Sequence, residues 1–180
     1  MSEVRIATPA DRDAMLPLLY LMHKENGVAP LSERKMQAAL DRGLARDKAI
    51  VGVIEEDGII KASIGLFVHE WWYSESVHIE DFWNFVHPEH RQSTHAKSLL
   101  KFARKASDGL VVQLLIGILS SERTAAKVRL YENEFGPSMG AGFVYPNPRA
   151  NEVVRPLVDK KRRRKAGGRY SIAKQQVAAE

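Results

Sequence analysis

The sequence contains no cysteine among its 180 residues. This absence excludes a disulfide framework, a thiolate nucleophile and a zinc site with cysteine ligands, and it fits a reducing compartment. No run of apolar residues approaches the roughly 20 that a membrane-spanning helix needs, and the first residues form neither a basic leader nor an apolar segment. We therefore expect a cytoplasmic protein with no membrane association.

The histidines show none of the spacings that mark a metal site on a helix. None of the six forms an HxxxH or HxxE pair on a predicted helix. His87, His90 and His95 lie close together in the sequence, where they suit phosphate or nucleotide contacts, or solvated loop positions. No metal is predicted.

Charge is unevenly distributed along the chain. The net charge is +5, but residues 155–180 carry +7 and residues 1–154 carry −2. Six consecutive basic residues, 160–165, are followed by glycines, a composition typical of a flexible arm. Such an arm either binds a polyanion, which could be RNA, DNA or an acidic protein surface, or only keeps the protein in solution.

A polar loop between an aromatic strand and an amphipathic helix is the most informative local pattern. Pro88 ends the strand because it removes a backbone donor, and the loop that follows leads into the helix at Ala96. The first turn of a helix has N–H groups without internal partners and carries about half a positive charge. The loop and Arg91 therefore predict an anion site suited to a pyrophosphate.

The same residues resemble the acyl-CoA-binding motif of the Gcn5-related N-acetyltransferases (GNATs), V-x-P-x-x-R-x-x-G-x-G/A followed by a leucine-rich helix. This chain reads V-x-P-x-x-R-x-x-T-x-A, with matches at Val86, Pro88, Arg91 and Ala96. Thr94 replaces a glycine that the family uses for close approach to the pyrophosphate. Because a β-branched residue tolerates positive φ poorly, either the loop takes another path or the cofactor binds more weakly than in the family.

Hydrophobic periodicity predicts alternating elements without an internal repeat. Glu56-Asp57-Gly58 is a hairpin turn, Asp108-Gly109 is a second turn, and the apolar run after it is a strand buried on both faces. The predicted strands are 4–7, 49–55, 59–68, 77–87, 110–119, 141–145 and 152–158, and the predicted helices run from Thr8 or Asp11 to Gly27, from Ser32 through Leu44, over 96–106 and over 121–134.

This order of elements matches the GNAT fold over residues 3 to about 158. The resemblance implies an α/β architecture, a mixed central sheet flanked by helices in which a splayed strand pair binds CoA. Residues 1–158 are then the acetyltransferase domain and residues 159–180 a basic tail, in a monomer or homodimer. Acetyl-CoA is the implied cosubstrate, and its pyrophosphate is expected at Arg91, Gln92, Ser93, Thr94, His95 and Ala96.

Acyl transfer from a thioester to an amine needs a base for the ammonium, donors for the oxyanion and an acid for the departing thiolate. A tyrosine with a pKa near ~10 can protonate a thiolate whose conjugate acid has a pKa near ~8.5. Tyr131 resembles the family's general-acid tyrosine; the alternative is an aromatic side chain packed in the core. Glu80 stands eleven residues before Arg91, where histone-acetylating members keep a glutamate base. Asp81 is the second candidate and must point to the opposite face; either carboxylate could instead simply face solvent.

The resemblance also assigns roles to main-chain groups and to a helix start. It implies that the backbone at Phe85 and Val86 pairs with the pantetheine arm and polarises the thioester carbonyl. In the family, the helix that carries the tyrosine opens with an asparagine seven residues earlier, where this chain has Thr124. We expect Thr124 among the cofactor-binding residues.

The acceptor is the least determined part of the prediction. Trp71-Trp72-Tyr73 and residues 26–31 occupy loops that line the acceptor site in this fold, although adjacent tryptophans also suit packing at a strand end. The expected acceptor is a primary amine of a small molecule, a protein or an aminoacyl-tRNA. The alternative is a non-catalytic member of the fold whose basic tail contacts nucleic acid or an acidic partner.

Overall fold

The computed structural model describes residues 3–120, 123–140 and 142. Its helices and strands all belong to one compact unit, residues 1–141. In chain order, the strands and α-helices are β1 (Arg5–Ile6), α1 (Arg12–Asn26), α2 (Glu33–Leu44), β2 (Ala49–Glu56), β3 (Ile59–Glu70), β4 (Val77–Val86), α3 (His95–Leu110), β5 (Gln113–Leu115) and α4 (Thr124–Phe135). Within these residues no helix is long and apolar enough to span a membrane.

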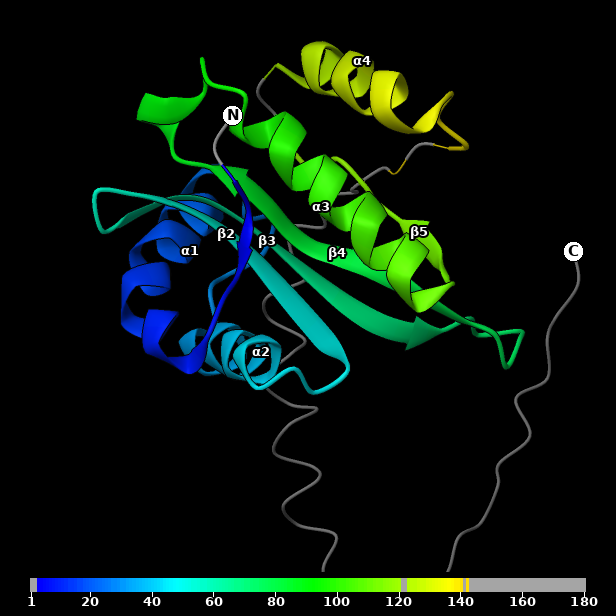
Figure 1. The fold of residues 1–180 in the computed structure, drawn as a ribbon, viewed down its shortest axis with the longest axis horizontal. Helices are drawn as coiled ribbons and strands as arrows, with labels where there is room; N and C mark the ends of the chain where they lie inside the picture. Colours follow the sequence, from blue (N-terminus) through cyan, green and yellow to red (C-terminus); the bar gives the residue numbers. More distant parts are fainter. Residues whose placement is uncertain (1–2, 121–122, 141, 143–180) are drawn as a thin grey trace, which may run out of the picture. The chain divides into compact units, whose positions relative to one another are not determined.

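The five strands form one mixed sheet in the order β1-β2-β3-β4-β5 (Figure 1). The first four are antiparallel to their neighbours, and β5 runs parallel to β4. The β2–β3 hairpin turns at Asp57 and Gly58, which both adopt positive φ, 54° and 73°. An Asp-Gly pair is favoured at such a turn because glycine accepts positive φ without steric cost.

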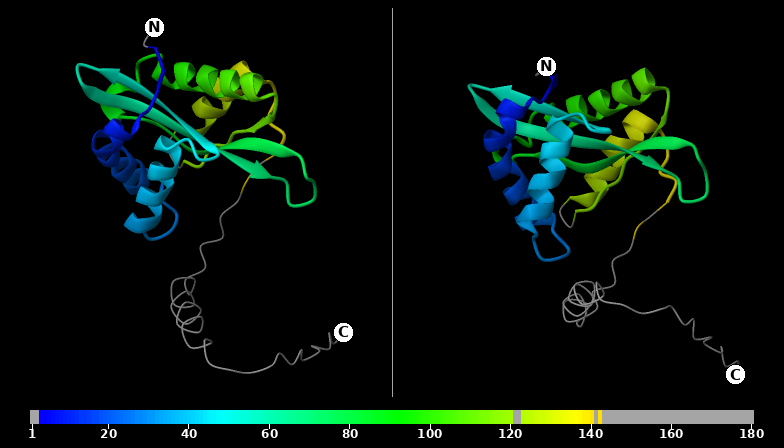
Figure 2. Two further views of the ribbon diagram at one scale, coloured as in Figure 1. Left: turned by 60° about the horizontal axis from the view of Figure 1, so that its bottom comes forward. Right: turned by 90° about the horizontal axis from the view of Figure 1, so that it is seen from below.

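Helices cover both faces of the sheet, with α1 and α2 on one face and α3 and α4 on the other (Figure 2). Each face has its own buried cluster, since alternate strand residues point to opposite sides. On the α1–α2 face the cluster includes Met15, Leu40 and Phe67. On the α3 face it includes Leu66 and Leu99. The expected α/β architecture, a mixed sheet flanked by helices, is therefore confirmed.

A β-bulge interrupts β4 at Phe82. The pairing with β3 steps from Gly65 opposite Trp83 to Leu66 opposite Asp81, so Phe82 has no partner. Gly65 is required here because a Cβ atom would lie 2.5 Å from the Trp83 ring. The bulge puts Asp81 and Asn84, three residues apart, on the same face of the sheet.

The predicted order of elements is confirmed through α4, with two corrections before it. The predicted turn at Asp108-Gly109 is wrong, because α3 continues through both residues and ends only where Val111 adopts a left-handed conformation with φ 56°. The hydrogen bond from the Val112 N–H to the Ser107 carbonyl, 3.3 Å long, closes that last turn. Packing of α3 on the sheet outweighs the local preference of Asp-Gly for a turn.

The predicted strand 110–119, buried on both faces, is also wrong in length and burial. Only Gln113–Leu115 is a strand, and the side chains of Gln113 and Leu115 are exposed while Leu114 is half-buried. In the described part of the chain β5 is the last strand of the sheet, and the alternation of its exposed and half-buried side chains shows that only one of its faces is partly covered. The predicted strands 141–145 and 152–158 lie, apart from Gly142, outside the described residues, as does the basic tail 159–180.

Candidate functional site

Strands β4 and β5 separate partway along their length. They pair only at His78, Ile79 and Glu80 of β4. At the next residue the Gly117 N–H donates to Asp81 Oδ1 at 2.8 Å, in place of a main-chain bond. From there to Val86, β4 has no ladder partner on the β5 side within the described residues. Main-chain groups along this edge can therefore bind an extended ligand in the manner of a strand.

Tyr131 on α4 reaches this opening. Its hydroxyl oxygen accepts a hydrogen bond of 2.9 Å from Asn84 Nδ2. Burial raises the pKa of Tyr131 well above its ordinary value, and the nearby charge of Asp81 raises it further. The phenol is therefore protonated at neutral pH, and because Asn84 acts as a donor, the phenolic proton remains available for another acceptor.

Asn84 is a site residue that sequence reasoning missed. In a regular strand, residues 81 and 84 would point to opposite faces, so nothing in the pattern groups Asn84 with Asp81 and Tyr131. Only the bulge at Phe82 brings them to the face that carries α3 and α4. Gly65 on β3, at the register shift, is a weak signal for that bulge, because an isolated glycine within a strand often marks a bulge or a close approach.

The two candidate bases lie on opposite faces, as predicted. Glu80 is paired with Phe67 on the α1–α2 face, where its carboxylate is 41% exposed and lies 4.0 Å from His78 Nε2. Asp81 lies on the other face. Burial raises the pKa of Asp81 to about 6, and the Glu80 charge adds to the effect. The neighbouring carboxylates thus differ strongly in solvation.

The loop before α3 follows a path that needs no glycine. Thr94, the N-cap of α3, has φ −86°, a value that a β-branched residue adopts without strain. Ser93 Oγ donates to the His90 carbonyl at 2.5 Å and accepts from the His95 N–H at 3.2 Å. The N–H groups of Gln92, Thr94 and Ala96 have no partner within the described residues. These three amides can hold an anion.

The His95 side chain does not face this anion site. It is buried, and its Nε2 lies 3.7 Å from Glu56 Oε1. Burial lowers the pKa of His95, which favours the neutral imidazole at neutral pH. Because the His95 N–H also bonds to Ser93 Oγ, this residue offers no free donor to the anion site in this structure.

Arg91 is engaged within the protein. Its Nη2 lies 2.5 Å from Glu25 Oε2, and both side chains are largely buried. Its Nε donates to the Val86 carbonyl at 3.3 Å, and the guanidinium lies 5.4 Å from the centre of the Phe85 ring. The cation therefore ties the end of α1 to the end of β4.

Thr124 is likewise engaged locally. Its hydroxyl donates to the Ser120 carbonyl at 2.8 Å, and Ser120 Oγ accepts from Lys127. The side chain thus stabilises the start of α4.

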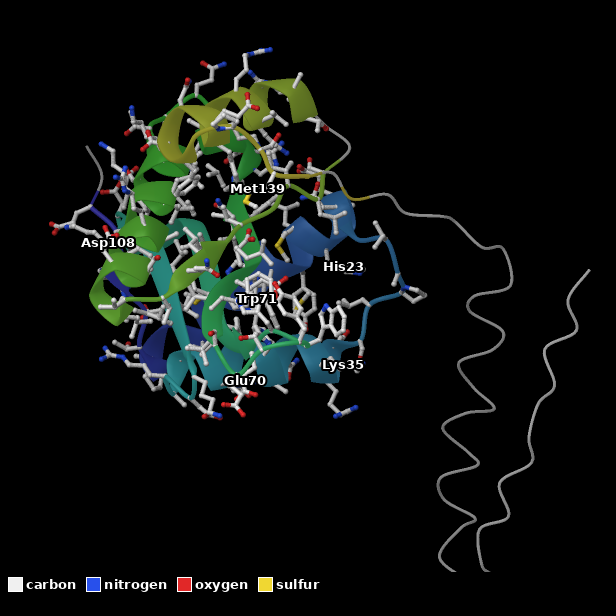
Figure 3. All side chains as sticks on the ribbon, turned by 90° about the vertical axis from the view of Figure 1, so that its right-hand side faces the viewer. His23, Lys35, Glu70, Trp71, Asp108 and Met139 are labelled. Carbon is white, nitrogen blue, oxygen red and sulfur yellow. The ribbon has the colours of Figure 1, made fainter. Side chains whose placement is uncertain are left out.

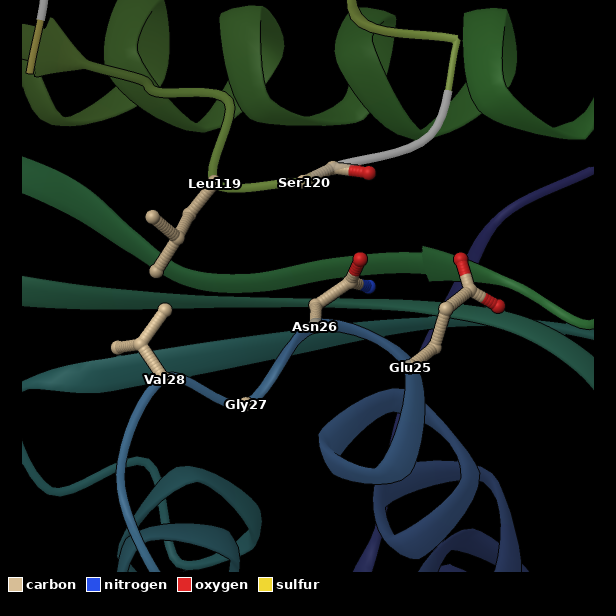
Figure 4. Close-up of a pocket in the computed structure, with 6 residues that line it drawn as sticks. All are labelled: Glu25, Asn26, Gly27, Val28, Leu119 and Ser120. Carbon is tan, nitrogen blue, oxygen red and sulfur yellow. The ribbon is translucent and has the colours of Figure 1, made fainter. Parts of the chain in front are cut away.

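A cavity of about 230 Å³ lies between the end of α1 and the chain that follows β5 (Figure 4). Two buried oxygens in its lining, Glu25 Oε1 and Asn26 Oδ1, have no hydrogen-bond partner within the described residues. Unpaired buried acceptors are costly, so this cavity is suited to a ligand group that carries donors. Its lining consists of Glu25, Asn26, Gly27, Val28, Leu119 and Ser120.

The aromatic loop between β3 and β4 combines packing at a strand end with exposed aromatic rings. Trp71, labelled in Figure 3, stacks on His78 with ring centres 4.1 Å apart and packs at the strand end. Trp72 and Tyr73 are instead 93% and 67% exposed. The loop thus presents two aromatic side chains to solvent.

No protein-family model and no curated protein matches the sequence. Solved structures do match. A protein from Clostridium acetobutylicum described as a predicted acetyltransferase, with acetyl-CoA bound, matches with a TM-score of 0.64 at 12% sequence identity, and the match covers 82% of this chain and 96% of that chain. The structure of AAC(6')-Iy in complex with the bisubstrate analogue CoA-S-monomethyl-acetylneamine matches with a TM-score of 0.62 at 15% sequence identity. The match covers 81% of this chain and 97% of that chain. A ribosomal-protein-alanine N-acetyltransferase from Brucella melitensis biovar Abortus 2308 matches with a TM-score of 0.60 at 15% sequence identity. The match covers 79% of this chain and 96% of that chain.

Proposed function

We infer from the Gcn5-related N-acetyltransferase fold, which this chain has, that the protein transfers an acetyl group from acetyl-CoA to a primary amine. The observation that carries this inference is the separation of β4 from β5 with the protonated Tyr131 hydroxyl beside it. A strand edge that can hold the pantetheine and an acid for the thiolate are two of the parts that direct transfer requires. The absence of cysteine excludes a thioester intermediate on the enzyme.

The cosubstrate would lie along the unpaired edge of β4, with main-chain groups near Phe85 and Val86 bonding to the pantetheine arm. Its pyrophosphate would meet the free amides of Gln92, Thr94 and Ala96. The acetyl-CoA present in the Clostridium structure supports this choice of cosubstrate. Arg91 contributes there only if the phosphate competes with Glu25 for the guanidinium.

Proton transfer would use groups on both faces of the sheet. Tyr131 would donate to the departing thiolate, since Asn84 fixes its oxygen and leaves its proton free. Glu80, on the opposite face, would accept the ammonium proton through water. Asp81 is the less suitable base because it shares a face with Tyr131 and is largely buried.

The acceptor is proposed to enter on the side of the α1–α2 loop. The unpaired oxygens of Glu25 and Asn26 match a group that carries several N–H donors, such as an ammonium. The names of the solved neighbours include aminoglycoside and ribosomal-protein-alanine acetyltransferases, which supports an amine of a small molecule or a protein. An aminoacyl-tRNA acceptor depends on the basic tail and stays a prediction.

A second candidate function is a non-catalytic binding module of the same fold. The engagement of Arg91 by Glu25 favours it, because the one arginine of the motif is then not available to a phosphate. Calorimetry of the full-length protein with acetyl-CoA separates the two. A ligand at a hundred times its Kd adds about 2.7 kcal/mol of stability, which a thermal melt detects. Absence of both heat and stabilisation would favour the module.

Acetyl transfer itself can be followed by the release of the CoA thiol in the presence of primary amines. The protein contributes no thiol of its own to such an assay. Binding of acetyl-CoA without thiol release across aminoglycosides, polyamines and lysine peptides would argue against transfer to those amines.

Replacing Arg91 with Gln is expected to weaken acetyl-CoA about tenfold, or about 1.4 kcal/mol, if the phosphate draws the guanidinium from Glu25. The matched control is Glu25→Gln, which breaks the same ion pair and leaves the cation in place. We expect this control to bind acetyl-CoA at least as tightly as the wild type in calorimetry. Equal weakening by both variants would show that the pair matters only for the fold.

Replacing Glu80 with Gln is expected to lower the rate mainly at neutral pH. Near pH ~10 a primary amine with a pKa near ~10.4 is already deprotonated to a substantial extent without help from a base, so the variant should come closer to the wild-type rate there. Asp81→Asn is the matched comparison on the neighbouring residue. If only Asp81→Asn shows the loss at neutral pH and the recovery at high pH, Asp81 is the base.

A further inference from the structure

Two histidines and a glutamate converge on the turn that links β4 to the loop before α3. His87, Glu89 and His90 each offer one ligand atom, and these atoms all lie within 4.8 Å of one another. The 3₁₀ turn Pro88–His90 produces this convergence, because residues three apart lie above one another on such a turn.

The backbone of this turn is held from three sides. The His87 N–H donates to the Lys61 carbonyl of β3 at 2.8 Å, and the His90 N–H donates to the His87 carbonyl at 2.9 Å. The His90 carbonyl accepts from both the N–H and the hydroxyl of Ser93. The side chains therefore project from a preformed scaffold.

A buried nitrogen at this turn has no hydrogen-bond partner within the part of the chain that the structure describes. His87 Nδ1 is shielded from solvent, and the nearest carboxylate oxygen, Glu89 Oε2, lies 3.8 Å away, beyond hydrogen-bonding distance. Most buried polar atoms in proteins are paired, so an orphaned ring nitrogen calls for an explanation. A bound metal ion, which accepts an electron pair from this nitrogen, would explain why the nitrogen has no hydrogen-bond partner.

The distances are close to those of a metal site. A tetrahedral ion with nitrogen and oxygen ligands at about 2.0–2.1 Å places those ligand atoms about 3.4 Å apart. The 3.8 Å between His87 Nδ1 and Glu89 Oε2 needs only a small side-chain rotation to reach this value. The rings of His87 and His90, with centres 5.8 Å apart, lie at a spacing that two imidazoles on one ion can adopt.

We propose that His87, Glu89 and His90 bind a divalent transition-metal ion, with zinc as the best match. Two imidazoles and one carboxylate are a borderline donor set that zinc accepts, and they leave a fourth position for water. The ion would add positive charge at the turn that leads into the anion-binding loop. This proposal does not rest on the proposed acetyl transfer, and it departs from the sequence analysis, which predicts no metal.

The test uses the full-length protein without an affinity tag, titrated with Zn²⁺ by calorimetry and with Co²⁺ by visible absorption. We expect one ion per chain, and the intense visible bands of tetrahedral Co²⁺ with no sulfur-to-cobalt charge-transfer band, since the chain has no cysteine. Zn²⁺ should displace Co²⁺ and abolish those bands. Absence of saturable binding of either ion would overturn the proposal.

Single substitutions then locate the ion. His90→Gln and Glu89→Gln should each weaken Zn²⁺ at least tenfold, and Glu89, whose side chain is 81% exposed, can be replaced without disturbing the core. His23→Gln removes a histidine that is not among the three proposed ligands and whose Nε2 already bonds to the Ala29 carbonyl at 2.9 Å, and it should leave the affinity unchanged. Zn²⁺ binding that survives both turn substitutions, or that is lost equally in His23→Gln, would place the ion elsewhere.

Discussion

Tyr131→Phe is expected to lower kcat for acetyl transfer about 100-fold or more, with little change in the KM for acetyl-CoA. Positioned acids and bases contribute about 10²–10⁴-fold, and the proton of Tyr131 would be used only as the thiolate leaves. Loss of a group that acts only in the transition state lowers kcat and kcat/KM together. Steady-state kinetics with a saturating amine measures both constants.

Tyr20→Phe is the matched control for this experiment. Tyr20 lies on α1 and also accepts a side-chain hydrogen bond, from Gln37 Nε2 at 3.3 Å. The control should keep wild-type kcat. If Tyr131→Phe raises KM and leaves kcat unaltered, Tyr131 is a packing or cofactor contact and the acid must be sought elsewhere.

Asp81→Asn is expected to stabilise the protein by about 3 kcal/mol at pH 8 and by almost nothing at pH 3.5. Burial raises the pKa of Asp81 from 3.8 to about 6, so the folded state holds this proton more tightly than the unfolded state does. Stability therefore falls as the pH rises from the unfolded pKa through the folded pKa, and one pKa unit of difference between the two states corresponds to about 1.4 kcal/mol. The asparagine carries no charge and escapes this loss.

Urea unfolding across this pH range measures the difference in stability between the variant and the wild type. In the wild type the Gly117 N–H donates to Asp81 Oδ1, and the side-chain oxygen of the asparagine can accept the same hydrogen bond. Asp13→Asn, at a carboxylate that is 95% exposed, is the matched control and should be nearly neutral at both pH values. A stabilisation by Asp81→Asn that is the same at pH 3.5 and pH 8 would show that the buried charge is not its cause.

Local signals predicted most of the fold. Gly27 ends α1, Ser32 precedes α2, and Asp57-Gly58 forms the hairpin turn, each for reasons contained in a few neighbouring residues. The errors at 108–119 arose where tertiary packing decided, because the length of α3 depends on its contacts with the sheet. A short-range pattern cannot report such contacts.

Motif spacing points to some parts of the candidate site and cannot point to others. The loop before α3 and the tyrosine of α4 could be found from motif spacing, which is a local property. The pairing of Arg91 with Glu25, which stands 66 residues earlier, could not. The bond from Asn84 to Tyr131 likewise spans 47 residues and depends on the bulge.

The unpaired residue Phe82 also determines where this strand can change in length. Deletion of Phe82 would leave Asp81 and Asn84 two positions apart, the spacing of a regular strand, so both side chains would keep their face while the strand straightens. A second residue inserted beside Phe82 could not be accommodated by straightening the strand. It would either enlarge the bulge or turn one half of the strand over, which would move the carboxylate or the amide away from Tyr131. Length variation in β4 is therefore tolerated in one direction only, whereas the β3–β4 loop can gain or lose residues without that consequence.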